Sequence, residues 1–201
     1  MTKFDQAIEQ WKKFFLAESP IRIGDLGARS EDTLAGNKKA TNDAIKRYSK
    51  VDEANVLGNK LNLFRNSDEN DKFEDFWLTD KPFLTCKIIL RKTGKGLTSL
   101  DTWNHRKFQG TCRRLFVDYY LSKYDFLMCD IYQSTDGEMC WRKLIEECSA
   151  KGHYISIIYP NGREEDLNPV RLIMNDEIWG SSTLYGERIK IYSLNKFPQS
   201  A

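Results

Sequence analysis

The chain has 201 residues, of which 30% are charged and 12% aromatic, and these values are typical of one globular domain of ordinary size. No stretch is long and apolar enough to span a bilayer, and the N-terminus lacks the continuous apolar segment of a secretory signal, so we expect a soluble, cytoplasmic protein. The net charge of +2 is too small to indicate nucleic-acid binding by itself, because such binding needs a basic patch.

The cysteine and histidine content argues against a metal site. There are five cysteines, an odd number without a C-x-x-C pair, and they read as buried apolar residues in a reducing compartment. The only histidines are His105 and His153, so no Cys/His cluster is available for zinc.

The N-terminal part of the chain is predicted to be helical. Apolar residues at helical spacing predict a helix over residues 5–18, ended by Ser19-Pro20. A loop over residues 24–37 and a second helix over about 39–51 are expected to follow. We expect residues 1–59 to belong to the same domain as an α/β core over 60–201.

From residue 60 onward the apolar period changes from helical to strand-like. Short strands are predicted around 61–64, 76–78, 83–90 and 97–103. They are followed by a helix over 111–123, a strand over 125–132, a helix over 136–151 and a strand over 153–159. This alternation predicts parallel strands in an α/β sheet, and the segments 170–174, 177–184 and 188–194 are expected to add one or two antiparallel strands.

A candidate phosphate loop lies between the fourth predicted strand and its helix, at residues 107–112. A glycine at this junction, Gly110, lets the chain turn tightly, and the N–H groups of the first helical turn then attract a phosphate. Arg113 and Arg114 could add cationic contacts to a pyrophosphate. The alternatives are a plain turn and two solvated arginines.

This junction resembles motif A of the GNAT superfamily of N-acetyltransferases, whose pattern is Arg or Gln-x-x-Gly-x-Gly or Ala. The chain has Lys107-x-x-Gly110-x-Cys112. The family's second motif, Asn-x-x-Ala-x-x-Leu-Tyr, is similar to Ser134-x-x-Gly137-x-x-Cys140-Trp141. By element order the resemblance spans about residues 60–195, and residues 130–141 also resemble small GNAT-like proteins of bacteriophages and mobile elements.

The resemblance implies a GNAT-like mixed sheet with flanking helices, and acetyl-CoA or another acyl-CoA as cofactor. In that family the fourth and fifth strands splay apart, and the thioester lies between them. Thr102 and Trp103 are then expected to lie beside the pantetheine arm. The residues implied around the pyrophosphate are Lys107, Gln109, Gly110, Thr111, Cys112 and Arg113.

Acyl transfer to an amine needs a base, and often an acid for the leaving thiolate. The base candidates are Asp101, His105 and Asp130, and Asp130 is favoured because it interrupts an otherwise apolar run. The alternative is that Asp130 caps a turn or pairs with an arginine. Trp141 stands where the family usually has its acidic tyrosine, which leaves Tyr132 and Ser134 as substitutes, unless they serve only a turn and a helix cap.

Three functions therefore remain open. The first is an acyl-CoA-dependent N-acyltransferase that acts on an unidentified amine or macromolecular substrate. The second is a catalytically inactive GNAT-fold binding protein, such as a phage-type inhibitor or modulator of a host protein. The third is nucleic-acid binding through a basic stripe, which could equally be a solvated helix face; it consists of Lys38, Lys39, Lys46, Arg47 and Lys50.

Overall fold

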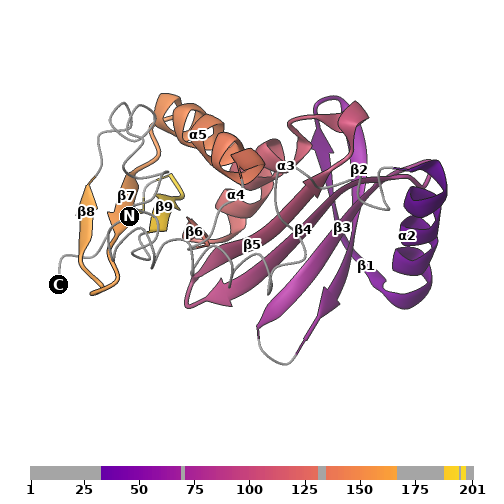
Figure 1. Ribbon diagram of the computed structural model, residues 1–201, viewed down its shortest axis with the longest axis horizontal. Helices are drawn as coiled ribbons and strands as arrows, with labels where there is room; N and C mark the ends of the chain where they lie inside the picture. The colour runs from indigo at the N-terminus through magenta and orange to yellow at the C-terminus, as the bar shows by residue number, and fades with distance from the viewer. Residues whose placement is uncertain (1–32, 69–70, 131–134, 167–187, 195, 198–201) are drawn as a thin grey trace, which may run out of the picture.

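The computed structural model describes residues 33–68, 71–130, 135–166, 188–194 and 196–197, with the side chains of 135, 136 and 138 left out. Within these residues the strands form one mixed sheet of nine strands, from β1 (Ser49–Val56) at one end to β8 (Glu164–Asp166) at the other (Figure 1). The α/β class with a mixed sheet is thus confirmed. No helix among the described residues is long and apolar enough to cross a membrane.

The elements follow the chain in the order helix, five strands, helix, strand, helix, strands. The helices are α2 (Leu34–Arg47), α3 (Thr111–Arg114), α4 (Leu121–Lys123) and α5 (Thr135–Ala150), with a 3₁₀ turn (Arg106–Phe108) before α3 and a π-helical segment (Leu115–Tyr120) between α3 and α4. The strands are β1 (Ser49–Val56), β2 (Asn59–Ser67), β3 (Lys72–Thr79), β4 (Leu84–Thr93), β5 (Gly96–Asn104), β6 (Phe126–Cys129), β7 (Ile155–Ile158), β8 (Glu164–Asp166) and β9 (Arg188–Tyr192). In the sheet they lie in the order β1-β2-β3-β4-β5-β6-β9-β7-β8.

Helix α2 begins and ends earlier than predicted. Thr33 caps it by accepting a hydrogen bond from the N–H of Gly36 (3.0 Å), so the last part of the predicted loop is helical. The buried face of α2 is largely polar, with Ala44 as its buried apolar residue. The Asn37 amide donates to the carbonyl of Leu84 (2.8 Å), and the Leu84 N–H donates to Thr41 Oγ1 (3.0 Å). A helix that docks through hydrogen bonds leaves little apolar periodicity, and this explains the misplaced boundaries.

Strands β1 to β5 form an antiparallel meander. Four of these strands were predicted, whereas the first three residues of β1, 49–51, were assigned to the second helix. The β1–β2 turn has two left-handed residues, Leu57 (φ 49°) and Gly58 (φ 77°), as a two-residue hairpin turn requires. Most side chains of β1 are exposed, so the strand lacks the alternation that would have predicted it.

The second half of the sheet is mixed. Strand β6 pairs in parallel with β5, and β9 lies between β6 and β7 and runs antiparallel to both. The predicted parallel direction is confirmed for β5, β6 and β7, because β6 and β7 are both antiparallel to β9. Only β5 and β6 pair directly, since β9 separates β6 from β7. The predicted strands at 170–174 and 177–184, and the helix at 5–18, lie outside the described residues.

Helices pack on both faces of the sheet. The consecutive residues Phe76 and Trp77 of β3 point to opposite faces, and each belongs to a different hydrophobic cluster. Trp77 lies in the larger cluster with residues 115–117 and 119–121 and with α5, whereas Phe76 lies in the smaller one with Ala44 of α2. The predicted helix 111–123 thus covers the larger core and starts at the end of β5.

Candidate functional site

The junction after β5 has the geometry of a strand-to-helix turn. Gly110 is the N-cap of α3 in the left-handed conformation (φ 85°), and a Cβ built there would come no closer than 3.8 Å to another side chain. The glycine is therefore required by its backbone conformation and not by lack of space. The N–H of Arg114 is bonded to the carbonyl of Gly110 (3.0 Å), so the N–H groups of residues 111–113 precede the helical hydrogen-bond ladder.

Hydrogen bonds among its own residues and the packing of a ring stabilise the turn between β5 and α3. The N–H of Lys107 donates to Nδ1 of His105 (3.2 Å), and the Asn104 amide donates to the carbonyl of Phe108 (2.6 Å). The His105 ring also packs edge-on against Phe83, with centroids 4.8 Å apart. The structure thus gives His105 a capping and packing role at the end of β5.

The side chains that follow Gly110 point inward. Thr111 and Cys112 are buried, and the Cys112 thiol donates to the carbonyl of Trp103 (3.3 Å). The outer surface of the loop therefore carries only backbone at these two positions, with the side chains of Lys107 and Gln109 exposed beside it. Cys112 does not narrow the approach to the loop.

The two arginines of the predicted loop are tied to α5. Arg113 Nε donates to Glu147 Oε2 (3.1 Å), and Arg114 pairs with the other carboxylate oxygen of Glu147. Lys151 is a third cation beside this carboxylate (3.4 Å). These contacts fix the start of the helix on α5, and a phosphate contact by Arg113 would have to share its guanidinium with Glu147.

Strands β5 and β6 pair over a short length. Three parallel pairs join them, ending at Ser99 with Cys129, while β5 continues to Asn104 along β4. The β4–β5 register also shifts after Ser99, a bulge that bends β5 where its pairing with β6 ends. Thr102 is half-buried on this free stretch, whereas the Trp103 side chain is buried in the smaller cluster with Ala44 of α2.

Two carboxylates lie at the same level of β5 and β6. Asp101 and Asp130 each follow the last β5–β6 pair by one or two residues, and both are half-buried. Asp101 Oδ1 accepts a hydrogen bond from the N–H of Thr102 (2.8 Å). Tyr132 and Ser134, the predicted acids, lie outside the described residues.

Trp141 is a core residue. Its side chain is 4% exposed and stacks on Phe116, with centroids 6.2 Å apart and the ring planes at 27°. It packs α5 onto the helix that starts at Gly110. The position where the resemblance puts the family's acid is thus filled by a packing side chain.

A buried polar network that the sequence did not predict holds the same helix on the sheet. Asp75 is fully buried, accepts two hydrogen bonds from Arg65 (2.6 and 2.7 Å) and a third from the Tyr120 hydroxyl (2.5 Å). Tyr120 OH in turn accepts from Trp77 Nε1 (3.1 Å). Burial and the Asp75 charge raise the pKa of Tyr120, whereas burial lowers the pKa of Arg65 and the contacts with Asp75 more than offset this. The sequence feature that could have predicted this network is the acidic residue Asp75 within the apolar run of β3.

The neighbouring tyrosine makes a more exposed contact with β1. Tyr119 donates to Asp52 Oδ2 (2.7 Å), which also pairs with Lys123. The hydrogen bonds from Lys123 and Tyr119 lower the pKa of Asp52 to about 2. Burial and the same carboxylate raise the pKa of Tyr119.

The basic stripe predicted on the second helix divides between two elements. Lys50 lies in β1 and pairs with Glu53 (3.0 Å). The other four cations lie on the outer side of α2 and are exposed: Lys38, Lys39, Lys46 and Arg47. They form a small solvated patch with Asp43 as the acidic residue of α2.

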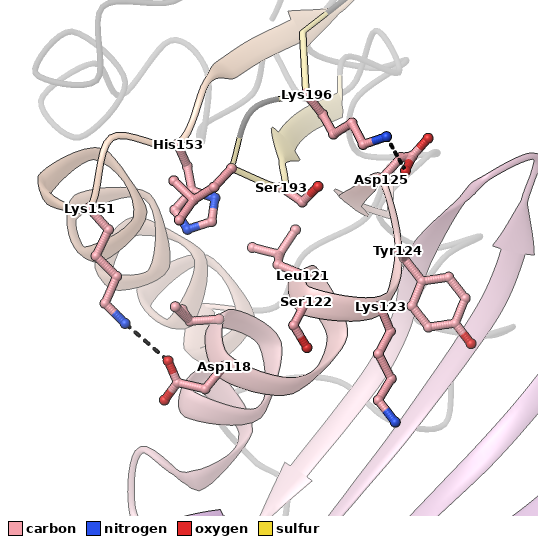
Figure 2. A pocket seen from close by; sticks show the side chains of 12 residues that line it. Asp118, Leu121, Ser122, Lys123, Tyr124, Asp125, Lys151, His153, Ser193 and Lys196 are labelled. Atoms are coloured by element: carbon pink, nitrogen blue, oxygen red, sulfur yellow. Dashed lines mark hydrogen bonds and ion pairs between the residues drawn. The ribbon is translucent and has the colours of Figure 1, made fainter.

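A hollow of about 400 Å³ lies at the opposite end of the helix that starts at Gly110. Figure 2 shows it between the end of α4, the end of α5 and the residues that flank β6, β7 and β9. Two ion pairs lie within it, Lys151 with Asp118 (3.0 Å) and Lys196 with Asp125 (3.4 Å), whereas Lys123 pairs with Asp52 outside it. None of the predicted site residues lines this hollow.

Among the described residues, no group of three or more His, Cys, Asp or Glu side chains could hold a metal ion. The cysteines described by the structure are free thiols. No protein-family model matches the sequence, and a search of curated proteins finds no significant match either.

Proposed function

We propose that the chain is an acyl-CoA-dependent N-acyltransferase of GNAT type that acts on an amine or macromolecular substrate. One observation supports this proposal above all. A helix starts at the left-handed Gly110 beside the stretch of β5 that extends beyond its short parallel pairing with β6. The nine-stranded sheet is larger than a typical GNAT sheet, so the likeness concerns the strands around this junction.

The residues at the junction fit a pyrophosphate. The N–H groups of residues 111–113 point out of the start of the helix, where the helix dipole favours an anion. Cys112 is turned into the core, so backbone can approach the ligand closely. Lys107 and Gln109 are the exposed side chains that would add contacts, and Thr102 would lie nearest the pantetheine arm.

Bound acyl-CoA would supply an acyl group already activated as a thioester. The chain's own part is to orient the acceptor amine and to take its proton, for which Asp130 and Asp101 are the candidates. His105 is a weaker candidate since its Nδ1 already accepts from Lys107. Tyr132 and Ser134 remain the proposed donors to the leaving thiolate.

The second candidate function is a GNAT-fold protein that binds a partner, such as a host protein, without catalysis. The burial of Trp141 against Phe116 favours it, because no acid stands at the place of the second motif. The commitment of Arg113 and Arg114 to Glu147 favours it as well. The exposed cations of α2 are the feature through which nucleic acid would bind, the third possibility.

Calorimetry with acetyl-CoA tests the first proposal, using a matched pair of variants at Gly110. Gly110→Asn and Gly110→Asp add side chains of the same size at a left-handed position that both residues tolerate, but only Asp adds a negative charge. Both should lose a similar amount of stability, about 1 kcal/mol, or about 2–4 °C in Tm. Gly110→Asp should in addition weaken acetyl-CoA binding at least tenfold relative to Gly110→Asn.

The result that refutes the acyltransferase is simple to recognise. If calorimetry detects no binding of acetyl-CoA to the wild-type protein at about millimolar concentration, the acyltransferase proposal is refuted and partner binding remains as the function. Equal affinity of the Asn and Asp variants would show that CoA binds away from Gly110.

A further inference from the structure

Arg188, the first residue of β9, lies at the carboxyl end of β6. It pairs with Ile158 of β7, and the N–H of the next residue, Ile189, donates to the Cys129 sulfur (3.0 Å). The β6–β9 register pairs Met128 with Lys190, and two residues further it brings Arg188 across from Asp130. Arg188 thus shares an edge of the sheet with the two proposed bases.

The Nε–H group of Arg188 has no hydrogen-bond acceptor among the described residues of the protein. Its Nε is buried and has no hydrogen-bond partner, and Arg188 forms no ion pair within the part of the chain that the structure describes. Two other partly buried arginines do have acidic partners, since Arg65 binds Asp75 and Arg113 binds Glu147.

A buried N–H without an acceptor is destabilising, and such groups are rare in folded proteins. A hydrophobic side chain of similar length would fill the same space without that cost. The position is therefore better explained by an acceptor that arrives with a ligand. The edge formed by Nε and one Nη matches the two oxygens of a carboxylate or phosphate. Arg65 shows that geometry within this chain, where Nε and Nη2 hold the two oxygens of Asp75.

We propose that Arg188 binds the carboxylate or phosphate oxygens of a ligand that enters at the carboxyl end of β6. Combined with the proposed function, on which this step rests, the ligand is the acyl acceptor: an amine that carries an anionic group. Asp130 then faces the amine of the same molecule while Arg188 holds its anionic end. Both ends of one small zwitterionic acceptor are recognised at one strand end.

Thermal unfolding with inorganic phosphate as the probe tests the anion site without CoA. Arg188→Met removes the unsatisfied donor and should raise the Tm in phosphate-free buffer by about 2–6 °C. Saturating phosphate at constant ionic strength should raise the Tm of the wild-type protein and leave that of Arg188→Met unchanged. Arg163→Met is the matched control, because Arg163 is 58% exposed and pairs with Glu165, and it should keep the phosphate response. Acetate in place of phosphate distinguishes a carboxylate from a phosphate preference.

Equal phosphate responses of Arg188→Met and wild type would overturn the proposal, as would a lower Tm of Arg188→Met without phosphate. Should that variant fail to fold, the Nε–H resonance of Arg188 in ¹⁵N-labelled wild-type protein gives the answer: a saturable shift with phosphate supports the site, and no shift refutes it.

The two proposals fail separately. If phosphate binds at Arg188 and acetyl-CoA does not bind at all, the anion site is supported, but the acyltransferase proposal and the assignment of its acceptor are both refuted. If acetyl-CoA binding depends on Gly110 but the Tm shift caused by phosphate does not depend on Arg188, only the acceptor proposal is overturned. Arg188→Met should leave acetyl-CoA affinity within twofold of wild type, because the cofactor contacts lie at the start of α3.

Discussion

Removing one hydroxyl from the buried network should destabilise the protein strongly. Tyr120→Phe keeps the ring in the core but deletes the group that donates to Asp75 and accepts from Trp77 Nε1. A hydrogen bond to a charged partner contributes about 1.5–3 kcal/mol, and the buried indole N–H left without an acceptor costs about 1–3 kcal/mol more. We expect a loss of about 3–5 kcal/mol, or about 10 °C in Tm for a chain of this length.

Tyr119→Phe is the matched control, one residue away in the same π-helical segment. Its hydroxyl donates to Asp52, which keeps Lys123 as a partner and whose side chain is 32% exposed. Water can replace the lost donor there, so the cost should be about 0.5–1.5 kcal/mol. Urea unfolding of both variants measures the two losses. Similar losses for Tyr119→Phe and Tyr120→Phe would refute the reasoning, since it depends on the difference in burial of the two carboxylates.

Two further predictions concern Asp52 and Trp141. The pKa of Asp52 is lowered from 3.8 to about 2, so its ionised form stabilises the fold at pH values above the unfolded pKa, and this contribution is lost as the pH falls through the folded pKa. The Tm difference between wild type and Asp52→Asn should therefore be constant from pH 7 to pH ~5 and shrink toward pH ~2, and a difference that persists at pH ~2 would contradict it. Trp141→Ala should lower the free energy of unfolding by about 3–5 kcal/mol and leave acetyl-CoA affinity unchanged in calorimetry. A gain of CoA-dependent turnover in Trp141→Tyr would contradict this assignment and indicate that residue 141 lies in the active site.

The sequence predicted the regular elements where their side chains follow the period of the element. Strand β4 and the helix from residue 111 to 123 bury apolar residues that recur at strand or helix spacing. Strand β1 is an edge strand with mostly exposed side chains, and α2 docks through Asn37 and Thr41, so neither presents that signal fully. The order of distant strands in the sheet could not be predicted either, because no residue of β9 indicates that this strand lies between β6 and β7.

The candidate site divides in the same way. A glycine between a strand and a helix is a local signal, and the structure gives Gly110 the left-handed conformation that such a turn needs. The directions of the neighbouring side chains depend on partners far along the chain: Cys112 turns toward Trp103, and Arg113 turns toward Glu147 on α5. The side chain of Trp141 is another example, since it is buried by stacking on Phe116, 25 residues earlier in the chain.

The helix that starts at Gly110 is held by polar contacts to four other elements. Cys112 donates to a carbonyl of β5, Arg113 binds α5, Tyr119 reaches β1, and Tyr120 reaches β3. Apolar packing alone would position this helix with less directional precision, because hydrophobic contacts are not directional and hydrogen bonds are. A helix fixed in this way holds its first N–H groups in one orientation, and this would lower the entropic cost of binding the proposed pyrophosphate. The network at Asp75 therefore supports the loop at Gly110 through the helix, although no residue of the network is placed to touch the proposed cofactor.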